Sequence, residues 1–552
     1  MLFPTFDFLV FIIPVLAVFW ALSHRPVARV LFLLGASYFF YMAGPKMDPP
    51  PTPWYFVGLL AFSTVLDYTC GHVIHRFASR RDDPDPRVAR RARSVRTLAL
   101  LASLVGNLGL LGYFKYVDFF VDTFVDIANA FGAGFIAPSF ETLLPVGISF
   151  YTFQSLSYTL DVWNGRLTPE PSFRKFALFV TFFPQLVAGP IVRASEFLPQ
   201  LHVRPRLNPT HIEEGLFRIF KGLVKKVVLG DWIAAQFTDA IFTSPEAYTS
   251  AEILLALYAF TLQIYADFSG YSDIAIGVAR LMGFELPENF DRPYQSRNLG
   301  EFWRRWHMTL STWLRDYLFF PLGGSRGSKG RTFFNLWLTM FLVGMWHYSP
   351  GTSWNFVLYA NIHAFAMVFN RWNRTRDREV ALGRKLLTWP LVLALLGGVV
   401  FALSRWGLAL EETASIGLAV FAVIMTLFVT WLPQTGTVFN TVVHVLLTFH
   451  FTVLSRIFFR AESFDAAKRM CAGLMSFDTA GLRPGLLSPW MWLALVFGTA
   501  YHFTPRNWVD VRAYAIFRRI PGPILGLAMG LLALGLMKLM AGSPRAFIYF
   551  AF

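Results

Sequence analysis

Three histidines, His307, His347 and His363, lie in a stretch from Glu301 to His363 that is otherwise rich in Leu, Phe, Trp and Met. An imidazole takes up and releases a proton close to neutral pH, which suits general acid–base catalysis. A titratable side chain is costly to hold among apolar residues in a membrane, and there it usually marks a functional site. The positions of these histidines therefore predict that the chemistry of the chain lies in this stretch.

His347 is the strongest candidate for a general base. It follows an uncharged run, FFNLWLTMFLVGMW, and precedes YSPGTSW, in which Pro350 and Gly351 interrupt a helix. Such breaks are tolerated within a membrane where protein or a water-filled cavity satisfies the freed backbone groups. We favour a catalytic role for His347. For His363, inside the next apolar segment, the sequence favours neither catalysis nor structure.

The segment from Glu301 to Tyr317 has no internal Pro or Gly and is predicted to form one helix. At about 100° per residue, its charged residues gather on one side and its apolar residues, with His307, on the other. Taken alone, His307 is best interpreted as a core histidine bonded to a neighbour, and the charged face as a surface at the headgroups. The charged side holds Arg304, Arg305, Arg315 and Asp316, and the apolar side holds Trp303, Trp306, His307, Leu310, Trp313 and Leu314.

Two aspartates, Asp267 and Asp273, lie upstream in the apolar segment YADFSGYSDIAIG. Small and hydroxyl residues often bind helices to one another in lipid, so a polar packing network is one interpretation. The other is a set of side chains that orient the histidines. The sequence leaves both open.

Several kinds of enzyme site have no support in the sequence. It contains no P-loop, no GxSxG, no HExxH and no GxGxxG in a βαβ context, which argues against nucleotide hydrolysis, serine-hydrolase chemistry and zinc proteolysis. The two cysteines, Cys70 and Cys471, are far apart and match no metal-ligand spacing. We therefore expect neither a disulfide framework nor a bound metal.

Composition predicts an all-α, polytopic integral membrane protein. Of 552 residues, 55% are hydrophobic and only 15% are charged, and the mean hydropathy is +0.47. The apolar residues come in runs of roughly 17 to 25, the length that crosses hydrocarbon. We expect about 10–13 transmembrane or re-entrant helices. The net charge of +15 suits positive loops on the cytoplasmic side better than nucleic-acid binding.

The basic turn SHRPVARV and the Arg-rich segment HRFASRRDDPDPRVARRARSVR both follow odd-numbered spans. The positive-inside rule makes both cytoplasmic and places the N-terminus outside the cytoplasm. Apolar spans are predicted near Phe8–Leu22, Val30–Met42, Tyr55–Ile74, Thr97–Tyr116, Ile253–Phe268, Leu386–Leu403, Ile416–Leu432, Thr441–Phe459, Leu486–Phe503 and Ile524–Met540.

We predict a single transmembrane domain, 1–552, with N-terminal spans in 1–142, a catalytic core in 143–370 and C-terminal spans in 371–552. Between Leu143 and Val192, prolines and glycines break the apolar run, so two spans and one span with a re-entrant segment remain open. HIEEGLFRIFKGLVKKVVLG is predicted to be an amphipathic helix at the cytoplasmic interface.

The sequence resembles the membrane-bound O-acyltransferase (MBOAT) family, and within it the bacterial alginate O-acetyltransferase-like branch. The resemblance is carried by YADFSGYSDIAIGVARLMGFELPENFDRPYQSRNLGEFWRRWHMTLSTWLRDYLFFPLGG, by GMWH, by TFHFTVLSRIFFRAESFDAA and by the closing FIYFAF. It implies helices arranged around a central tunnel, and an acyl group, commonly acetyl, that moves from a cytoplasmic thioester to a hydroxyl at or beyond the outer face. The family's essential histidine matches His347, and its second active-site histidine matches His307.

The resemblance further implies a bacterial cytoplasmic (inner) membrane enzyme that modifies an exported polysaccharide or cell-wall glycan, with a separate extracytoplasmic transferase as partner. The donor, acetyl-CoA or an acyl-carrier protein, is a substrate, and no permanently bound cofactor is expected. Two alternatives stay open: D-alanyl transfer from a carrier protein, and a proton-coupled transporter or channel. Residues expected to support the site are His363, Asp267, Asp273, Trp303, Trp306, Trp346 and Asn355.

Overall fold

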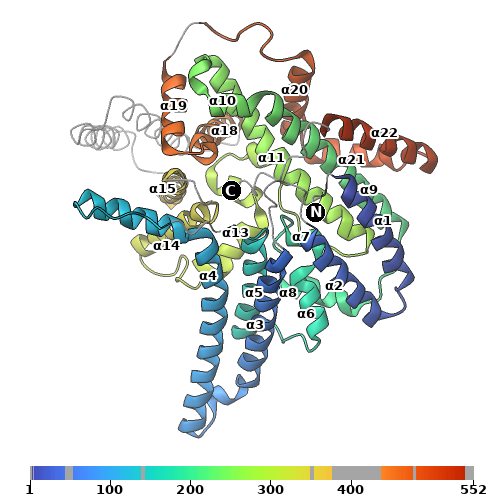
Figure 1. Cartoon of the computed structure of the whole chain (residues 1–552), viewed down its shortest axis with the longest axis vertical. Coiled ribbons are helices and arrows are strands. Elements are labelled where there is room, and N and C mark those ends of the chain that lie inside the picture. Colours follow the sequence, from blue (N-terminus) through green and yellow to red (C-terminus); the bar gives the residue numbers. More distant parts are fainter. Residues whose placement is uncertain are drawn as a thin grey trace. The chain divides into compact units, whose positions relative to one another are not determined.

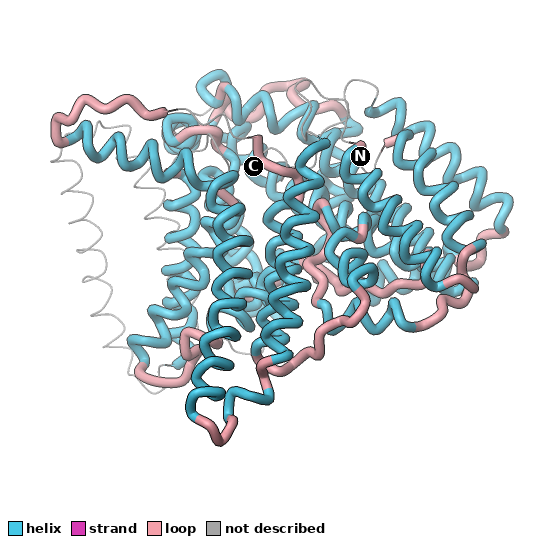
Figure 2. Tube along the Cα trace, turned by 60° about the horizontal axis from the view of Figure 1, so that its bottom comes forward, coloured by secondary structure: helices cyan, strands magenta, loops and turns pink. Residues whose placement is uncertain are grey.

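The computed structural model describes residues 3, 5–43, 54–138, 143–348, 354–375, 437–476 and 480–540. Within these ranges the regular elements are helices and there is no strand (Figure 2). The prediction of an all-α protein is therefore confirmed. The chain divides into two compact units, the first from Met1–Val227, Asp267–Asn289 and Arg512–Phe552, and the second from Val228–Ala266 and Phe290–Val511.

The first unit is built around three helices that pack side by side, α3 (Val57–Arg76), α4 (Pro86–Ala130) and α5 (Ile148–Trp163) (Figure 1). Buried Asp67 on α3 accepts hydrogen bonds from Asn107 on α4 and Thr159 on α5, at 2.9 and 3.1 Å. The other helices wholly within this unit are α1 (Phe6–Ala21), α2 (Pro26–Met42), α6 (Phe173–Thr181), α7 (Phe183–Leu186), α8 (Ala194–Phe197), α9 (Pro209–Leu223) and α22 (Gly522–Met540).

The second unit carries the three candidate histidines. In it α15 (Asn355–Thr375) packs against α14 (Lys329–Trp346), α18 (Val438–Arg460) and α12 (Leu299–Arg305). Its remaining helices include α10 (Asp239–Thr243), α13 (Met308–Leu314), α19 (Phe464–Met475) and α20 (Pro489–Phe503). Two helices, α11 (Ser250–Leu281) and α21 (Arg506–Phe517), contribute residues to both units.

Four helical segments in the described part are long and apolar enough to cross a membrane: Trp54–Asp82, Pro86–Ala130, Ser250–Leu281 and Val438–Arg460. They contain four of the predicted spans. The predicted spans near the N-terminus correspond to the shorter apolar helices α1 and α2. The predicted spans Leu386–Leu403 and Ile416–Leu432, and the closing FIYFAF, lie outside the described residues.

The broken apolar run between Leu143 and Val192 forms one longer helix followed by short ones. α5 starts directly after Gly147, whose φ of +76° suits glycine and whose added Cβ would lie 2.6 Å from the carbonyl oxygen of Leu186. The second half of the run is divided between α6, α7 and α8. α5, with 16 residues, is not among the helices long and apolar enough to cross a membrane, so the number of spans in this run stays a prediction.

The predicted amphipathic helix, 211–230, forms as α9 up to Leu223 and continues as a π-helix, Val224–Trp232. α9 packs against the C-terminal half of α11 within the first unit. Glycines permit the close approach, because a Cβ on Gly222 would lie 2.6 Å from the carbonyl oxygen of Gly270, and one on Gly215 2.9 Å from that of Gly277. α9 therefore has a protein-facing side as well as its polar side.

Candidate active site

The three histidines come from three different places in the second unit. His307 lies between α12 and α13, His347 caps the C-terminus of α14, and His363 lies within α15. All three imidazoles are buried, with exposed fractions of 0%, 2% and 2%. Aromatic rings surround them, as the composition of the stretch predicted.

His347 is held by the end of its own helix. Its Nδ1 donates a hydrogen bond of 2.7 Å to the carbonyl oxygen of Val343, one turn earlier. Because a carbonyl can only accept, Nδ1 carries the proton, and in the neutral ring Nε2 has the lone pair. The imidazole is therefore in the tautomer that a general base at Nε2 requires.

The position of His347 depends on the close contact of α14 with α15. A Cβ added to Gly344 would lie 2.5 Å from Cα of Ala360, so only glycine fits there without a shift of one helix. Since Gly344 precedes His347 by less than one helical turn, this contact sets how far His347 lies from α15.

The prediction of one helix from Glu301 to Tyr317 is wrong. The helix stops at Arg305, Trp306 is extended, and His307 has φ +44° and ψ +56°, in the left-handed region. That conformation costs a non-glycine residue about 1–2 kcal/mol. It is offset because Nδ1 of His307 accepts a long hydrogen bond of 3.4 Å from the backbone N–H of Leu310, which caps α13.

Despite this break, the apolar and charged sides are those predicted: Trp303, Trp306 and His307 are buried, and Arg304 is exposed. Since Nδ1 of His307 accepts a hydrogen bond, its Nε2 carries the proton in the neutral ring. His307 and His347 therefore have opposite tautomers, one suited to donate from Nε2 and the other to accept there.

α12 is fixed at both ends before the break. Asn298 caps it by accepting from the backbone N–H of Glu301 at 2.9 Å. The carboxylate of Glu301 accepts from the N–H of Arg297 at 3.0 Å and pairs with Arg305 at 2.7 Å. Burial alone would raise the pKa of Glu301, but these partners hold it below its ordinary value.

The indole of Trp346 lies beside both histidines. Its ring centroid is 5.7 Å from that of His307 and 5.0 Å from that of His347, in edge-on arrangements. Phe459 of α18 contacts His347 at 5.7 Å. The structure thus brings His307, His347 and Trp346 together.

His363 faces α18. Its Nε2 lies 3.1 Å from Oγ of Ser455, whose hydroxyl already donates to the carbonyl oxygen of Thr452, so Nε2 is the donor. Its ring lies 5.5 Å from that of Trp303 and 4.5 Å from that of Tyr359. His363 is therefore part of the α15–α18 packing next to Trp303.

Arg456 is a buried residue near the site that the sequence analysis missed. It is 2% exposed, its guanidinium lies 4.8 Å from the ring centroid of Trp306 and 5.3 Å from that of Phe459, and it donates weakly to the hydroxyl of Tyr359 at 3.5 Å. The available signal was an arginine inside the apolar run FTVLSRIFF, where a charge is costly.

Asn355, at the start of α15, is fully buried. Its amide Nδ2 donates to the carbonyl oxygen of Ala461 at 3.1 Å, whereas Oδ1 has no hydrogen-bond partner among the described residues. The predicted helix break at Pro350 and Gly351, just before it, lies outside the described residues. Within the described part of the chain, no group of three His, Cys, Asp or Glu side chains could hold a metal ion.

Asp267 and Asp273 belong to the first unit, where both pair with basic residues on α9 or directly after it. Lys226 pairs with Asp267, and Asp273 lies 2.7 Å from Arg218 and 2.8 Å from Lys225. This is the polar packing network that the sequence left open as one interpretation.

Comparison with known proteins gives the same family as the sequence motifs. The family model of the membrane-bound O-acyltransferase family matches residues 52–396. The probable alginate O-acetylase AlgI of Pseudomonas aeruginosa is 37% identical over 403 residues, covering 73% of this chain and 72% of that protein.

Two further relatives act on other polymers by name. A peptidoglycan O-acetyltransferase of Helicobacter pylori is 36% identical over 307 residues, covering 50% of this chain and 56% of that protein. A teichoic acid D-alanyltransferase of Bacillus subtilis is 32% identical over 245 residues, covering 42% and 60%. The family match includes His307 and His347, both of which contact Trp346. It shows that this chain belongs to the membrane-bound O-acyltransferase family and is a multi-pass membrane enzyme that transfers acyl groups.

Proposed function

We propose that this acyltransferase moves an acetyl group from a thioester on the cytoplasmic side to a hydroxyl of an exported polysaccharide or cell-wall glycan, with His347 as general base. The observation that carries the assignment is the hydrogen bond from Nδ1 of His347 to Val343, which leaves Nε2 as the acceptor. Relatives named for alginate and peptidoglycan O-acetylation support acetyl as the group and a glycan as the acceptor.

In the proposed reaction, Nε2 of His347 takes the proton of the acceptor hydroxyl while its oxygen attacks the thioester carbonyl. The C–O bond forms, the C–S bond breaks, and the proton passes from the imidazolium to the leaving thiolate. A positioned base of this kind contributes about 10²–10⁴-fold to the rate. His307, with its proton on Nε2, orients the substrate or His347.

Two buried polar atoms suit the substrates. Nε1–H of Trp303 and Oδ1 of Asn355 have no hydrogen-bond partner among the described residues. An indole N–H can donate to the developing oxyanion, and an amide oxygen can accept from a second hydroxyl of the glycan, next to the one that attacks. His363 contacts Trp303 and supports it from α15.

The aromatic surroundings of His347 protect the thioester from water. Since the ring is 2% exposed, donor and acceptor reach Nε2 only when neighbouring side chains move. We place the chain in the bacterial cytoplasmic membrane with its N-terminus outside, because its Arg-rich loops then face the cytoplasm. Acetyl-CoA or an acyl-carrier protein supplies the acyl group, and an extracytoplasmic transferase completes the modification.

D-alanyl transfer from a carrier protein is the second candidate. The likeness to the teichoic acid D-alanyltransferase of Bacillus subtilis favours it. The same base would serve, because an acyl group again passes from a thioester to a hydroxyl.

Two assays on membranes that contain the chain distinguish acetyl transfer from D-alanyl transfer. One supplies labelled acetyl-CoA, and the other supplies a labelled D-alanyl carrier protein. We expect label from acetyl-CoA to appear in glycan, and His347→Ala to abolish it at unchanged protein level. His450→Ala is the matched control, because Nδ1 of His450 also donates to a carbonyl one turn earlier, that of Leu446. Label from the carrier protein alone would establish D-alanyl transfer instead, and undiminished acetyl transfer in His347→Ala would disprove the assignment of the base.

A further inference from the structure

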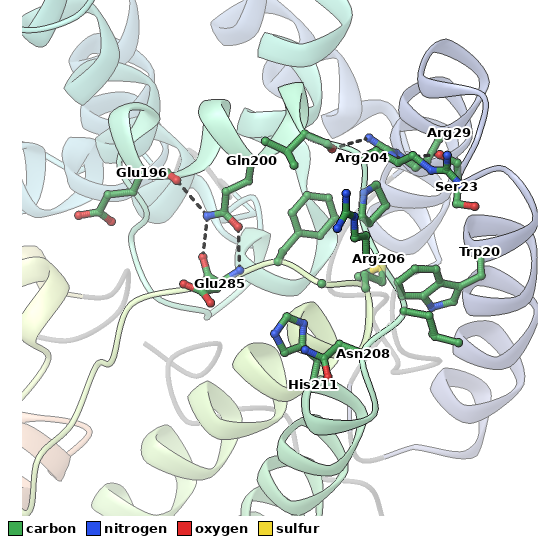
Figure 3. Close-up of a pocket in the computed structure, with 16 residues that line it drawn as sticks. Trp20, Ser23, Arg29, Glu196, Gln200, Arg204, Arg206, Asn208, His211 and Glu285 are labelled. Carbon is green, nitrogen blue, oxygen red and sulfur yellow. Dashed lines mark hydrogen bonds between the residues drawn. The ribbon is translucent and has the colours of Figure 1, made fainter.

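A cavity of about 1150 Å³ opens in the first unit, and none of its lining residues takes part in the proposed chemistry. Its walls come from the turn between α1 and α2, from 203–208, from the start of α9 and from the residues that follow α11 (Figure 3). This volume is slightly above the roughly 300–1,000 Å³ that is typical of small-molecule sites. The basic residues that line it are Arg29, Arg204, Arg206 and His211.

Arg29 is a buried charge without a carboxylate. It is 2% exposed, its two terminal nitrogens donate to the carbonyl oxygens of Ser23 and Val203, at 3.5 and 3.4 Å, and its guanidinium lies 5.9 Å from the ring centroid of Phe19. Among the described residues its Nε has no hydrogen-bond partner, and its hydrogen bonds go to backbone carbonyls and to no carboxylate. Buried guanidinium groups are normally paired, because removing the charge from water is costly.

Neighbouring groups do not supply the missing negative charge. Arg204 contacts the ring of His24 at 3.1 Å, and Nδ1 of His211 is buried with no hydrogen-bond partner among the described residues. Both glutamates of the lining, Glu196 and Glu285, lie across the cavity from Arg29 and Arg204 in Figure 3. Glu285 is already paired with Arg280 at 2.5 Å.

We propose that this cavity binds a phosphate group of an amphipathic ligand, with Arg29 and Arg204 as its cationic partners. Guanidinium groups match phosphate oxygens with paired N–H donors. The remaining lining includes Trp20, Met282 and Phe284, which suit an apolar portion next to the phosphate. An anionic phospholipid headgroup and a soluble phosphate compound share this chemistry. The proposal does not depend on the acetyl-transfer assignment.

The test uses the purified full-length chain in detergent, with native mass spectrometry to measure bound phosphatidylglycerol against phosphatidylcholine. A thermal-stability assay with inorganic pyrophosphate tests the soluble source. We expect one of the two probes, phosphatidylglycerol or pyrophosphate, to bind the wild type. Arg29→Gln and Arg204→Gln should each weaken that binding at least about tenfold, as loss of a charge-assisted hydrogen bond implies. Arg25→Gln, which changes an exposed arginine of the same turn that does not line the cavity, should bind as the wild type does.

Phosphatidylglycerol binding that is lost in the variants and unaffected by pyrophosphate identifies a lipid site. Pyrophosphate stabilisation that is lost in the variants identifies a site for a soluble phosphate. If Arg29→Gln does not yield folded protein, binding by Arg204→Gln alone tests the proposal, because Arg204 is exposed. Absence of binding by both probes, or binding by Arg204→Gln equal to that of the wild type, would overturn the proposal.

Discussion

At the scale of single residues, the two histidines beside Trp346 differ in which ring nitrogen carries the proton. His347 donates from Nδ1 to Val343, and His307 accepts at Nδ1 from Leu310. Each interaction is with backbone of its own segment, so each tautomer is set locally, before any substrate arrives. A proton can therefore be accepted at one Nε2 and offered at the other.

Replacing His307 by asparagine separates its chemistry from its backbone role. Asparagine tolerates the left-handed conformation and its side-chain oxygen can cap α13, so we expect thermal stability close to that of the wild type. Acyl transfer should nevertheless fall at least about tenfold, because the N–H at Nε2 is lost. Wild-type transfer rates in a stable His307→Asn protein would show that His307 is only structural.

Arg456 is expected to stabilise the site rather than to react. Its guanidinium lies over Trp306 and Phe459, and a desolvated cation–π contact contributes up to about 2 kcal/mol. Arg456→Met, which keeps an unbranched chain without the charge, should lower the unfolding temperature. Arg460→Met on the same helix, whose guanidinium is only partly buried, is the comparison. Equal effects of the two changes would remove any special role for Arg456.

At the scale of helices, α14 and α15 position His347 through their contact at Gly344. Gly344→Ala would place a methyl group against the backbone of Ala360 and force the helices apart. We expect acyl transfer and thermal stability both to fall. Gly330→Ala is the matched control, because a Cβ at Gly330 in the same helix meets nothing within 4 Å and the better helix propensity of alanine favours stability. Similar activities in the two variants would argue against this account of positioning.

The sequence predicted the helices better than it predicted their breaks. Apolar periodicity correctly placed Trp303, Trp306 and His307 on a buried face, because burial follows from hydrophobicity at helical spacing. It could not reveal the break at His307, since the stabilising cap comes from the histidine's own side chain and no Pro or Gly marks it.

At the scale of the whole molecule, membrane character and the acyltransferase family could be predicted from the sequence, because long apolar runs and extended motifs need no tertiary information. The partners of buried charges could not. Asp273 pairs with Arg218, which is 55 residues away in the chain, and such contacts depend on how α9 packs on α11. The position of Arg456 in an apolar run marked it as unusual, but its contacts with Trp306, directly after α12, and with Tyr359 of α15 could not be predicted.

The central claim is that His347 removes a proton from the acceptor hydroxyl during acyl transfer. Its most direct test is the single-turnover rate of acetyl transfer to a hydroxyl acceptor by the purified chain in proteoliposomes. We predict that His347→Ala lowers this rate by about 10²–10⁴-fold, and that added imidazole restores part of it by filling the space of the missing ring. An undiminished rate in His347→Ala, or a lowered rate that imidazole leaves unchanged while His450→Ala is lowered equally, would contradict the account.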